Sequence, residues 1–384
     1  MQFRQKGLVE PGHTRRTADA TRVVRSYSDL MASHDVAGSF SIERLSIGRH
    51  GPLCIIAEAG VNHDGDLKAA LALIDAAHSA GADIVKFQCF SANALVSADA
   101  PTCAYQAQSA SVSQRDMLRR LELSRADFTQ LKVHADQIGI AFLATPFGLR
   151  ELASLIELGV PAFKIASPDI VNLPLLDAAA RSRLPLIVST GAAELNEIDA
   201  TVARIRRNDA NYPLALLHCI SAYPTALKDA HLSCIRTLSD RYQTPVGFSD
   251  HTMEVETGSL AVAAGAVILE KHLTLDRRRT GPDHFFSLEP ADFARYVERA
   301  RSAHAALGDG VITVTPQQRE VRQLARGSIV ATRLIPAGAK LAADMLAVQR
   351  PGTGLSPLEW DQIVGRLTQR EIQPGEQLAH DALR

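Results

Sequence analysis

The chain has 384 residues, of which 46% are hydrophobic and 22% are charged, and its formal net charge is -1. This near-neutral balance argues against a protein that binds nucleic acid or a membrane surface through its overall charge. No run of about 18 apolar residues occurs, so no transmembrane helix is expected. The length is sufficient for a barrel-sized domain followed by a smaller one.

Residues 1–42 differ from the rest, because they are rich in Arg, Thr, Ser and Asp and show no apolar period. We predict that they form a flexible extension. They are not a secretory signal, because no apolar core of roughly 7–15 residues follows the charges. The five cysteines lack C-x-x-C spacing, and their odd number fits reduced thiols in a cytoplasmic protein.

From residue 53 onward, short apolar runs alternate with amphipathic helical patterns. Apolar strands that alternate with helices indicate a parallel sheet covered on both faces. Eight such units predict a closed (β/α)₈ TIM barrel within residues 43–312. An open doubly wound sheet is the alternative, but no G-x-G-x-x-G turn follows the first run. The eight runs are 53–60, 83–88, 140–147, 162–167, 185–191, 213–221, 245–252 and 266–274.

Nearly every predicted strand starts apolar and ends polar, and barrel active sites lie at the carboxyl ends of the strands. One isolated polar residue at a strand end is usually a satisfied structural group, but polar ends on all eight strands indicate an active site. These end residues are Glu58, Lys86, Gln88, Thr145, Phe147, Ser167, Ser189, His218, Ser221, Tyr223, Ser249, Asp250, His251, Glu270 and His272.

Two of these residues suggest a metal site. His251 and His272 end the seventh and eighth strands, and neighbouring strands lie about 4.8 Å apart. Each histidine alone would more often make a local hydrogen bond. Together, and with Glu270 nearby, they predict a catalytic divalent ion. Imidazole with carboxylate or water ligands suits Mn²⁺, Fe²⁺, Co²⁺ or Zn²⁺.

The remaining polar groups leave alternatives open. Lys86 is either a Schiff-base lysine or a cation that holds phosphate or carboxylate. Lys164, by alternation from Ser167, is expected to point to the opposite face. Glu58 is a candidate general base. The loop 276–287 is either a solvated loop or, as we favour, a lid that brings Asp283 to the substrate.

After a polar linker at 313–325, residues 326–384 contain an internal repeat. The segment 334–346 aligns with 371–383 at an offset of 37 residues, which predicts a compact β-rich module. Between the two halves, a Pro/Gly turn displays Arg350. A lone arginine of this kind is usually an ordinary surface residue.

Several stretches resemble the sialic acid synthase family, which makes N-acetylneuraminate, legionaminate or pseudaminate from phosphoenolpyruvate and an N-acyl amino sugar. They include "IIAEAGVNHDGDLKAAL", "DIVKFQCF", "FKIASPDIVNLPLL", "VGFSDHT", "ILEKHLTLDRRRTGPDHFFSL" and "QRPGTGLSP", and the match covers about residues 45–384. The resemblance implies a barrel followed by an antifreeze-like (SAF, β-clip) domain. It also implies a domain-swapped homodimer in which Arg350 reaches the partner's active site.

The resemblance also implies roles for the strand ends. The metal ligands would be His251 and His272, with Mn²⁺ as the first expectation and Mg²⁺ or Co²⁺ as alternatives. The mechanistic glutamate would be Glu58. The groups that hold phosphoenolpyruvate would be Lys86, Thr145, Ser167, Ser189 and Ser249. The sugar would contact Gln88, Tyr223, Asp283 and Arg350, with Glu270 as a further catalytic carboxylate facing it. Phe147 and Ser221 would also bind substrate.

Three hypotheses follow. In the first, the metal ion polarises the sugar aldehyde, phosphoenolpyruvate condenses with it, and Glu58 helps a water to attack. The second is a Schiff-base aldolase that uses Lys86 on a pyruvate-type substrate and is insensitive to chelators. The third is a sugar- or surface-binding protein, in which changes at Glu58 or His251 would leave binding unchanged.

Overall fold

The computed structural model describes residues 38–49, 51–97 and 113–384. The chain forms two compact units, and the boundary between them in the sequence falls after Gly308. Each unit is considered by itself. None of the helices in the described ranges combines the length and the apolar character needed to pass through a bilayer.

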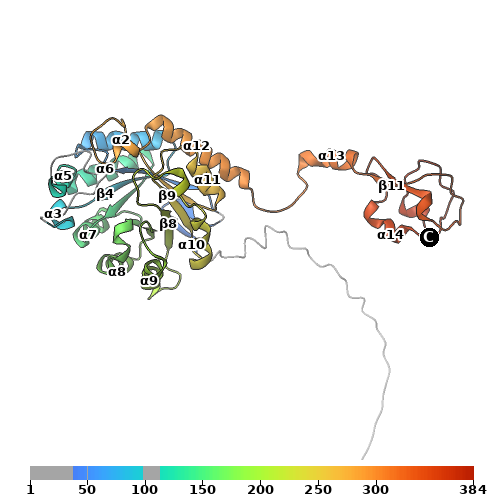
Figure 1. Ribbon diagram of the computed structural model, residues 1–384, viewed down its shortest axis with the longest axis horizontal. Coiled ribbons are helices and arrows are strands. Elements are labelled where there is room, and N and C mark those ends of the chain that lie inside the picture. Colours follow the sequence, from blue (N-terminus) through green and yellow to red (C-terminus); the bar gives the residue numbers. More distant parts are fainter. Residues whose placement is uncertain (1–37, 50, 98–112) are drawn as a thin grey trace, which may run out of the picture. The chain divides into compact units, whose positions relative to one another are not determined.

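The first unit is a closed barrel of eight parallel strands, in the order β10-β3-β4-β5-β6-β7-β8-β9 (Figure 1). Each predicted apolar run contains one strand, so the prediction of a (β/α)₈ barrel is confirmed. The strands are β3 Cys54–Gly60, β4 Ile84–Cys89, β5 Ala141–Pro146, β6 Phe163–Ile165, β7 Leu186–Ser189, β8 Leu214–Cys219, β9 Val246–Asp250 and β10 Ile268–His272.

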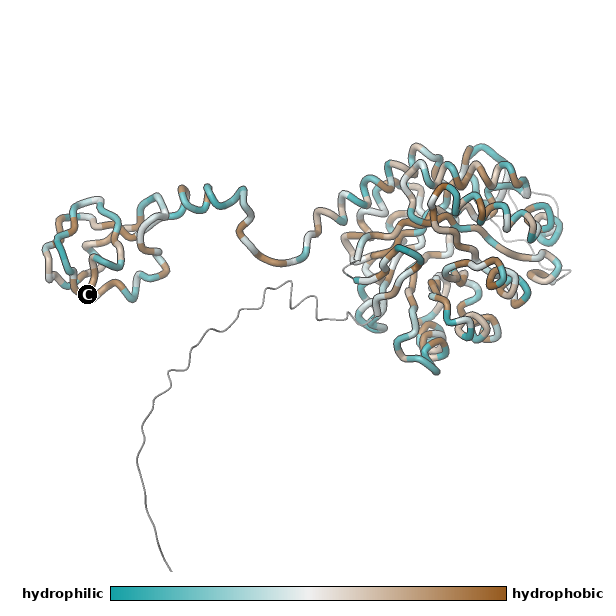
Figure 2. Tube along the Cα trace, turned by 180° about the vertical axis from the view of Figure 1, so that it is seen from behind, coloured by the Kyte–Doolittle hydropathy of each residue, from teal (hydrophilic) through white to brown (hydrophobic). Residues whose placement is uncertain are grey.

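Helices surround the barrel, and hydrophobic residues concentrate in its interior while hydrophilic ones line the outer faces of the helices (Figure 2). Local signals define their ends: the Asp66 side chain caps the N-terminus of α2, and Ser124 and Asp127 form a capping box on α6. The helices of this unit are α2 Leu67–Ser79, α3 Ala92–Leu95, α5 Gln114–Arg120, α6 Arg125–Ile138, α7 Leu149–Leu158, α8 Leu173–Arg181, α9 Leu195–Arg206, α10 Cys234–Tyr242, α11 Thr257–Ala263 and α12 Pro290–Leu307.

A two-stranded hairpin precedes the barrel. Its strands are β1 (Phe40–Ile42) and β2 (Leu45–Ile47), which pair in antiparallel fashion. Ile42 and Ile47 are buried in the same apolar cluster as Ile56 and Ile268 of the barrel strands. The predicted boundary of the flexible extension, at residue 42, is therefore too far along the chain, because Ile42 and its neighbour Phe40 pack into the barrel core. Residues 1–37 of that extension lie outside the described residues.

The second unit contains α13 (Pro316–Ala325) and a small β-rich module with β11 (Ser328–Ala331), β12 (Leu346–Gln349) and α14 (Trp360–Ile363). The predicted repeat is visible in its structure. Ile335 and Ile372, equivalent in the two halves, form a bridge to each other, and Leu341 and Leu378 are both buried. The repeat therefore supplies one shared hydrophobic core.

Candidate active site

Strand alternation divides the barrel lumen into an apolar base and a polar mouth. Ile56 and Glu58 of β3 lie two residues apart and so face the same side, as do Ile84 and Lys86 of β4. The apolar member of each pair belongs to the cluster that fills the base. The polar member therefore lies one layer higher, at the carboxyl end of the strand, where it is buried yet reachable from the mouth.

A cavity of about 360 Å³ lies at this mouth. It brings together most of the predicted site residues, from all eight strands or the loops that follow them. The predicted residues that line it are Glu58, Lys86, Gln88, Thr145, Phe147, Ser167, Ser189, Tyr223, Ser249, His251, Glu270, His272 and Asp283.

Lys86 is the centre of the charged cluster in this cavity. Its Nζ lies 2.5 Å from a carboxylate oxygen of Glu58 and 3.5 Å from one of Glu270. It also donates a hydrogen bond to Thr145 at 3.2 Å. Glu58 accepts a further hydrogen bond from Gln88, and Glu270 accepts one from Ser249. The buried charges are thus paired, as desolvated groups must be.

The cluster separates the acid–base properties of its two glutamates. Burial raises the pKa of Glu58; the charge of Lys86 opposes this rise and that of Glu270 adds to it. Burial also acts on Glu270, but the charges of Lys164 and Lys86 outweigh it and lower the pKa of Glu270 to about 2. Glu270 is therefore a fixed anion, whereas Glu58 holds a proton more readily than Glu270 does, which suits a general base.

Lys164 corrects one prediction. Its Nζ lies 3.4 Å from Glu270 and it lines the cavity, whereas alternation counted from Ser167 placed it on the opposite face. The count failed because β6 ends at Ile165, and Ser167 already begins a 3₁₀ turn, Ser167–Val171. Lys164 is thus a site residue that sequence reasoning assigned to the wrong face, and counting alternation from a strand that ends at Ile165 would have placed it correctly.

Two other polar strand residues face away from the cavity. His218 binds the carbonyl oxygen of Ala230 and stacks on Phe248. Asp250 pairs with the buried Lys271 at 3.1 Å. Both belong to the packing between strands and helices, so they are structural groups and not part of the candidate site.

His251 and His272 lie side by side, with ring centroids 5.5 Å apart. The Nδ1 of His251 lies 2.8 Å from the carbonyl oxygen of Ile220, which fixes its ring and leaves Nε2 available to a ligand. The buried Nδ1 of His272 has no hydrogen-bond partner among the described residues. Burial, followed by the charge of His251, lowers the pKa of His272, so this imidazole is neutral, as a metal ligand must be.

These two histidines fit a divalent ion that is also open to substrate. Within the described residues, no group of three or more His, Cys, Asp or Glu side chains forms a preformed metal cage. Two imidazoles are fewer than the three protein ligands of a common catalytic zinc site, so an ion held here would take its other ligands from water or substrate, whereas a structural zinc site is closed by four protein ligands.

Aromatic rings pack around the histidine pair. Tyr223 lies with its ring centroid 4.3 Å from that of His251, and Phe286 lies 4.8 Å from His272. Phe286 was not predicted, because a phenylalanine in a loop carries no signal of its own. The two rings limit how far the imidazoles can rotate.

The hydroxyl groups occupy the opposite wall. Ser167 accepts a hydrogen bond from the backbone N–H of Gly191, and the buried hydroxyl of Ser189 has no partner among the described residues. An unpaired buried hydroxyl facing a cavity is available to a ligand. Ser221 is exposed and does not line the cavity, although a Cβ on Gly191 would come within 2.4 Å of its hydroxyl. Arg350 belongs to the second unit and is exposed there.

Asp283 lies at the cavity on the loop that follows β10. Its carboxylate is 3.8 Å from Nδ1 of His272. Burial, followed by the charge of Glu58, raises the pKa of Asp283 to about 7. The predicted approach of this loop to the site is therefore present in the structure.

His63, next to the site, gives a pH prediction. It is fully buried, its Nδ1 accepts a hydrogen bond from the Gly65 N–H, and burial lowers its pKa to about 4. Below about pH 6.5 the His63 imidazole is protonated in the unfolded chain but stays neutral in the folded chain. The free energy of unfolding therefore falls between about pH 6.5 and 4, by up to about 3 kcal/mol. Urea unfolding of the wild type and of His63→Gln should show a difference that depends on pH in this window. The control is His134→Gln, which removes a partly exposed histidine and should follow the wild type at every pH. The same dependence of unfolding free energy on pH in all three proteins would contradict the prediction.

The chain was compared with known protein families and with characterised relatives. Residues 73–312 match the NeuB family and residues 326–384 match the SAF domain. The N,N'-diacetyllegionaminic acid synthase of Legionella pneumophila is 40% identical over 329 residues, covering 84% of this chain and 92% of the relative. The pseudaminic acid synthase of Campylobacter jejuni is 31% identical, covering 86% of this chain and 96% of the relative.

A solved structure agrees. The N-acetylneuraminic acid synthetase of Leptospira borgpetersenii, in complex with citrate, has 38% identity and a TM-score of 0.68, covering 75% of this chain and 96% of that one. These relatives confirm the predicted enzyme class, a sialic-type acid synthase. Because the match spans the barrel and the terminal module, and the strand-end residues meet in one cavity, the chain belongs to the NeuB family and carries a SAF domain.

Proposed function

We propose that this enzyme condenses phosphoenolpyruvate with an N-acyl amino sugar to give a nine-carbon, sialic-type acid and phosphate. The observation that carries the proposal is the convergence of Lys86 and Lys164 with the hydroxyls of Ser167 and Ser189 at one cavity. Lysine ammonium groups and hydroxyls bind phosphate and carboxylate. Burial raises the pKa of Asp283 to about 7, so this carboxyl group opposes an anionic substrate less than an exposed aspartate would.

In the proposed reaction, C3 of phosphoenolpyruvate bonds to C1 of the open-chain sugar, and the sugar carbonyl oxygen takes up a proton to become a hydroxyl. Glu58 accepts a proton from the water that adds at C2, which balances the proton taken up by the sugar oxygen. The resulting tetrahedral intermediate breaks the bond between C2 and the bridging phosphate oxygen, and the C2 hydroxyl gives its proton to the departing phosphate as the keto group forms. Lys86 and Lys164 hold the anionic groups of phosphoenolpyruvate during these steps. His251 and His272 would hold a divalent ion, with Mn²⁺ expected first, which supplies Lewis-acid polarisation of a carbonyl when bound.

The aldolase alternative is disfavoured by the state of Lys86. Burial by itself would lower the pKa of this amine, but the charges of Glu270 and Glu58 outweigh it and raise the pKa. A protonated amine cannot attack a carbonyl. Borohydride in the presence of pyruvate should therefore leave the chain unmodified.

The deciding experiment is a phosphate-release assay with phosphoenolpyruvate, Mn²⁺ and a panel of sugars. A 2,4-diacetamido-2,4,6-trideoxyhexose comes first, because relatives of 40% and 38% identity are N,N'-diacetyllegionaminic acid synthases, and N-acetylmannosamine comes second. Release of phosphate that requires one of these sugars, together with a product of matching mass, is the expected result. No release with any member of the panel would refute the proposal.

We also propose that the enzyme works as a domain-swapped homodimer in which Arg350 completes the partner's site. Two inactive chains, Lys86→Met and Arg350→Ala, should then complement each other when co-expressed. Half of random dimers are mixed and have one complete site, so about a quarter of wild-type activity should return. If Arg350 served its own barrel, no mixed dimer would have a complete site and no activity would return. Arg370→Ala, which removes another exposed arginine of the same unit, should stay active.

A further inference from the structure

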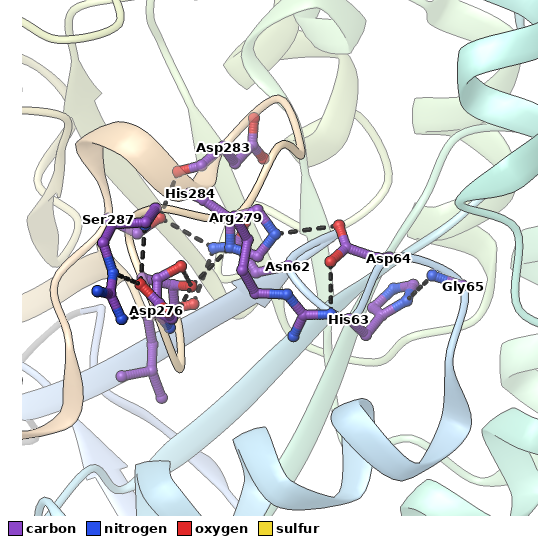
Figure 3. Close-up of polar contacts among 12 residues, drawn as sticks. Asn62, His63, Asp64, Gly65, Asp276, Arg279, Asp283, His284 and Ser287 are labelled. Carbon is purple, nitrogen blue, oxygen red and sulfur yellow. Dashed lines mark hydrogen bonds and ion pairs between the residues drawn. The ribbon is translucent and has the colours of Figure 1, made fainter. Parts of the chain in front are cut away.

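A polar network joins two loops beside the active site. The loop after β3, residues 60–66, and the loop after β10, residues 276–287, lie more than 200 positions apart in the chain but contact each other through Asp64, His284 and Arg279 (Figure 3). We call these three residues the Asp64 latch. None of them lines the cavity, whereas Asp283, the neighbour of His284, does.

The latch is closely defined. Nε2 of His284 donates to one oxygen of Asp64 at 3.0 Å, because a carboxylate can only accept, and Arg279 pairs with the other oxygen at 2.8 Å. His284 is fully buried, and its Nδ1 lies 2.6 Å from the hydroxyl of Thr274. The pKa of Asp64 is lowered: partial burial opposes this shift, but the hydrogen bond and charge of His284 and the charge of Arg279 outweigh it.

The backbone confirms that the two loops fit tightly. A Cβ on Gly281 would lie 2.6 Å from Cδ2 of His284 and 2.7 Å from a carboxylate oxygen of Asp64, so no other residue fits without a shift. A second set of hydrogen bonds joins the same two loops. Asn62 donates to the hydroxyl of Ser287 at 2.9 Å, and that hydroxyl donates to the carbonyl oxygen of Asp283 at 2.5 Å. The hydrogen bond from Ser287 thus fixes the carbonyl oxygen of Asp283, and the latch fixes the next residue, His284.

We propose that Asp64 is a positioning residue, which fixes the Asp283 carboxylate at the cavity by latching the loop after β10 onto the loop after β3. Asp64 does not touch the cavity; it acts through His284 and the backbone of residue 283. A displacement of about 1 Å at a reacting group can cost about 100-fold in rate. The inference rests on the proposed role of Asp283 toward the sugar, and it adds a residue that no cavity contact reveals.

The primary test compares Asp64→Asn with the matched control Asp177→Asn. Asp177 also pairs with an arginine, Arg204, at 2.5 Å, and its side chain is 20% exposed against 28% for Asp64, but it lies on α8, away from the cavity. With the panel sugar that the wild type consumes, Asp64→Asn should lower kcat/KM for the sugar by about 10- to 100-fold. The KM for phosphoenolpyruvate should stay within about threefold of the wild-type value, and Asp177→Asn should resemble the wild type.

A double-mutant cycle distinguishes positioning from a general loss of stability. If Asp64 acts through Asp283, Asp64→Asn should add less than about threefold to the loss already caused by Asp283→Asn. Arg279→Lys keeps the charge and should retain most of the activity, whereas Arg279→Met should not. Multiplicative losses in the cycle, or an Asp64→Asn variant that behaves like Asp177→Asn, would overturn the proposal.

One measurement does not depend on turnover. Amide hydrogen exchange in residues 276–287 should quicken in Asp64→Asn and stay unchanged in Asp177→Asn, with the rest of the barrel unaffected. If no sugar of the panel is consumed, the proposed function is refuted. The exchange measurement still tests the latch in that case, because it does not require turnover. Unchanged exchange in Asp64→Asn refutes the latch even if turnover by this variant is lowered.

Discussion

Lys86→Met is expected to lower kcat/KM for phosphoenolpyruvate by about 100- to 1,000-fold, because it removes a preorganised cation from the cavity. The phosphate-release assay measures this loss. Methionine approximates the length of the lysine stem, so the change removes the charge with little change in packing. Lys132→Met is the control, since Lys132 pairs with Asp136 on α6 and does not line the cavity.

The same variant should lose stability in a way that depends on pH. Without the ammonium group, Glu58 loses its charged partner while Glu270 keeps Lys164, and an uncompensated buried charge costs about 3–5 kcal/mol. Loss of the cation raises the folded-state pKa of Glu58, which burial already holds above its usual value, still further, and it also raises the folded-state pKa of Glu270. The deficit is therefore largest near pH 7 and shrinks as the pH falls toward about 5, where the carboxyl groups take up protons.

Urea unfolding at pH 7 and pH 5 checks this prediction. A deficit of the same size at both values would show that the carboxylates do not depend on Lys86 for their charge balance. Full use of phosphoenolpyruvate by Lys86→Met would remove Lys86 from the substrate-binding groups.

His251→Gln and His272→Gln are each expected to weaken Mn²⁺ binding by at least about 100-fold and to lower phosphate release in proportion, since each removes one of two imidazole ligands. Free Mn²⁺ measured by electron paramagnetic resonance gives the affinity independently of activity. Dialysis of the wild type against a chelator should abolish activity, and added Mn²⁺ should restore it.

His134→Gln is the matched control, because His134 is partly exposed on α6 and pairs with Asp75 outside the barrel. Full activity of the wild type after exhaustive chelation would exclude a catalytic metal ion. Unchanged Mn²⁺ affinity in both histidine variants would place the ion elsewhere in the chain.

Much of the fold was predictable because its determinants are local. Apolar runs with polar ends identified all eight strands, and the 37-residue repeat identified the core of the terminal module. Within a strand, side chains alternate between faces, so Lys86 and Gln88, or Glu270 and His272, could be assigned to one face from spacing alone. The adjacency of His251 and His272 then followed from the pairing of consecutive parallel strands, since β9 and β10 are neighbours in the chain and in the sheet.

Alternation became unreliable where a strand ended earlier than the sequence suggested. Lys164 was assigned to the wrong face because β6 ends at Ile165. His218 and Asp250 were grouped with the other polar ends, yet their partners, the Ala230 carbonyl and Lys271, lie outside the lumen. Which buried partner a polar side chain finds depends on packing between elements, and that is absent from the local pattern.

The barrel, the terminal module, the family and most of the polar side chains at the cavity could be predicted from the sequence, because each follows from period, spacing or motif. The packing of the β1–β2 hairpin against the barrel core, the pairing of Lys164 with Glu270, and the contact of Asp64 with His284 emerge only in the folded chain. These features join segments far apart in the chain. Their energies come from burial and charge pairing that exist only when the chain is folded.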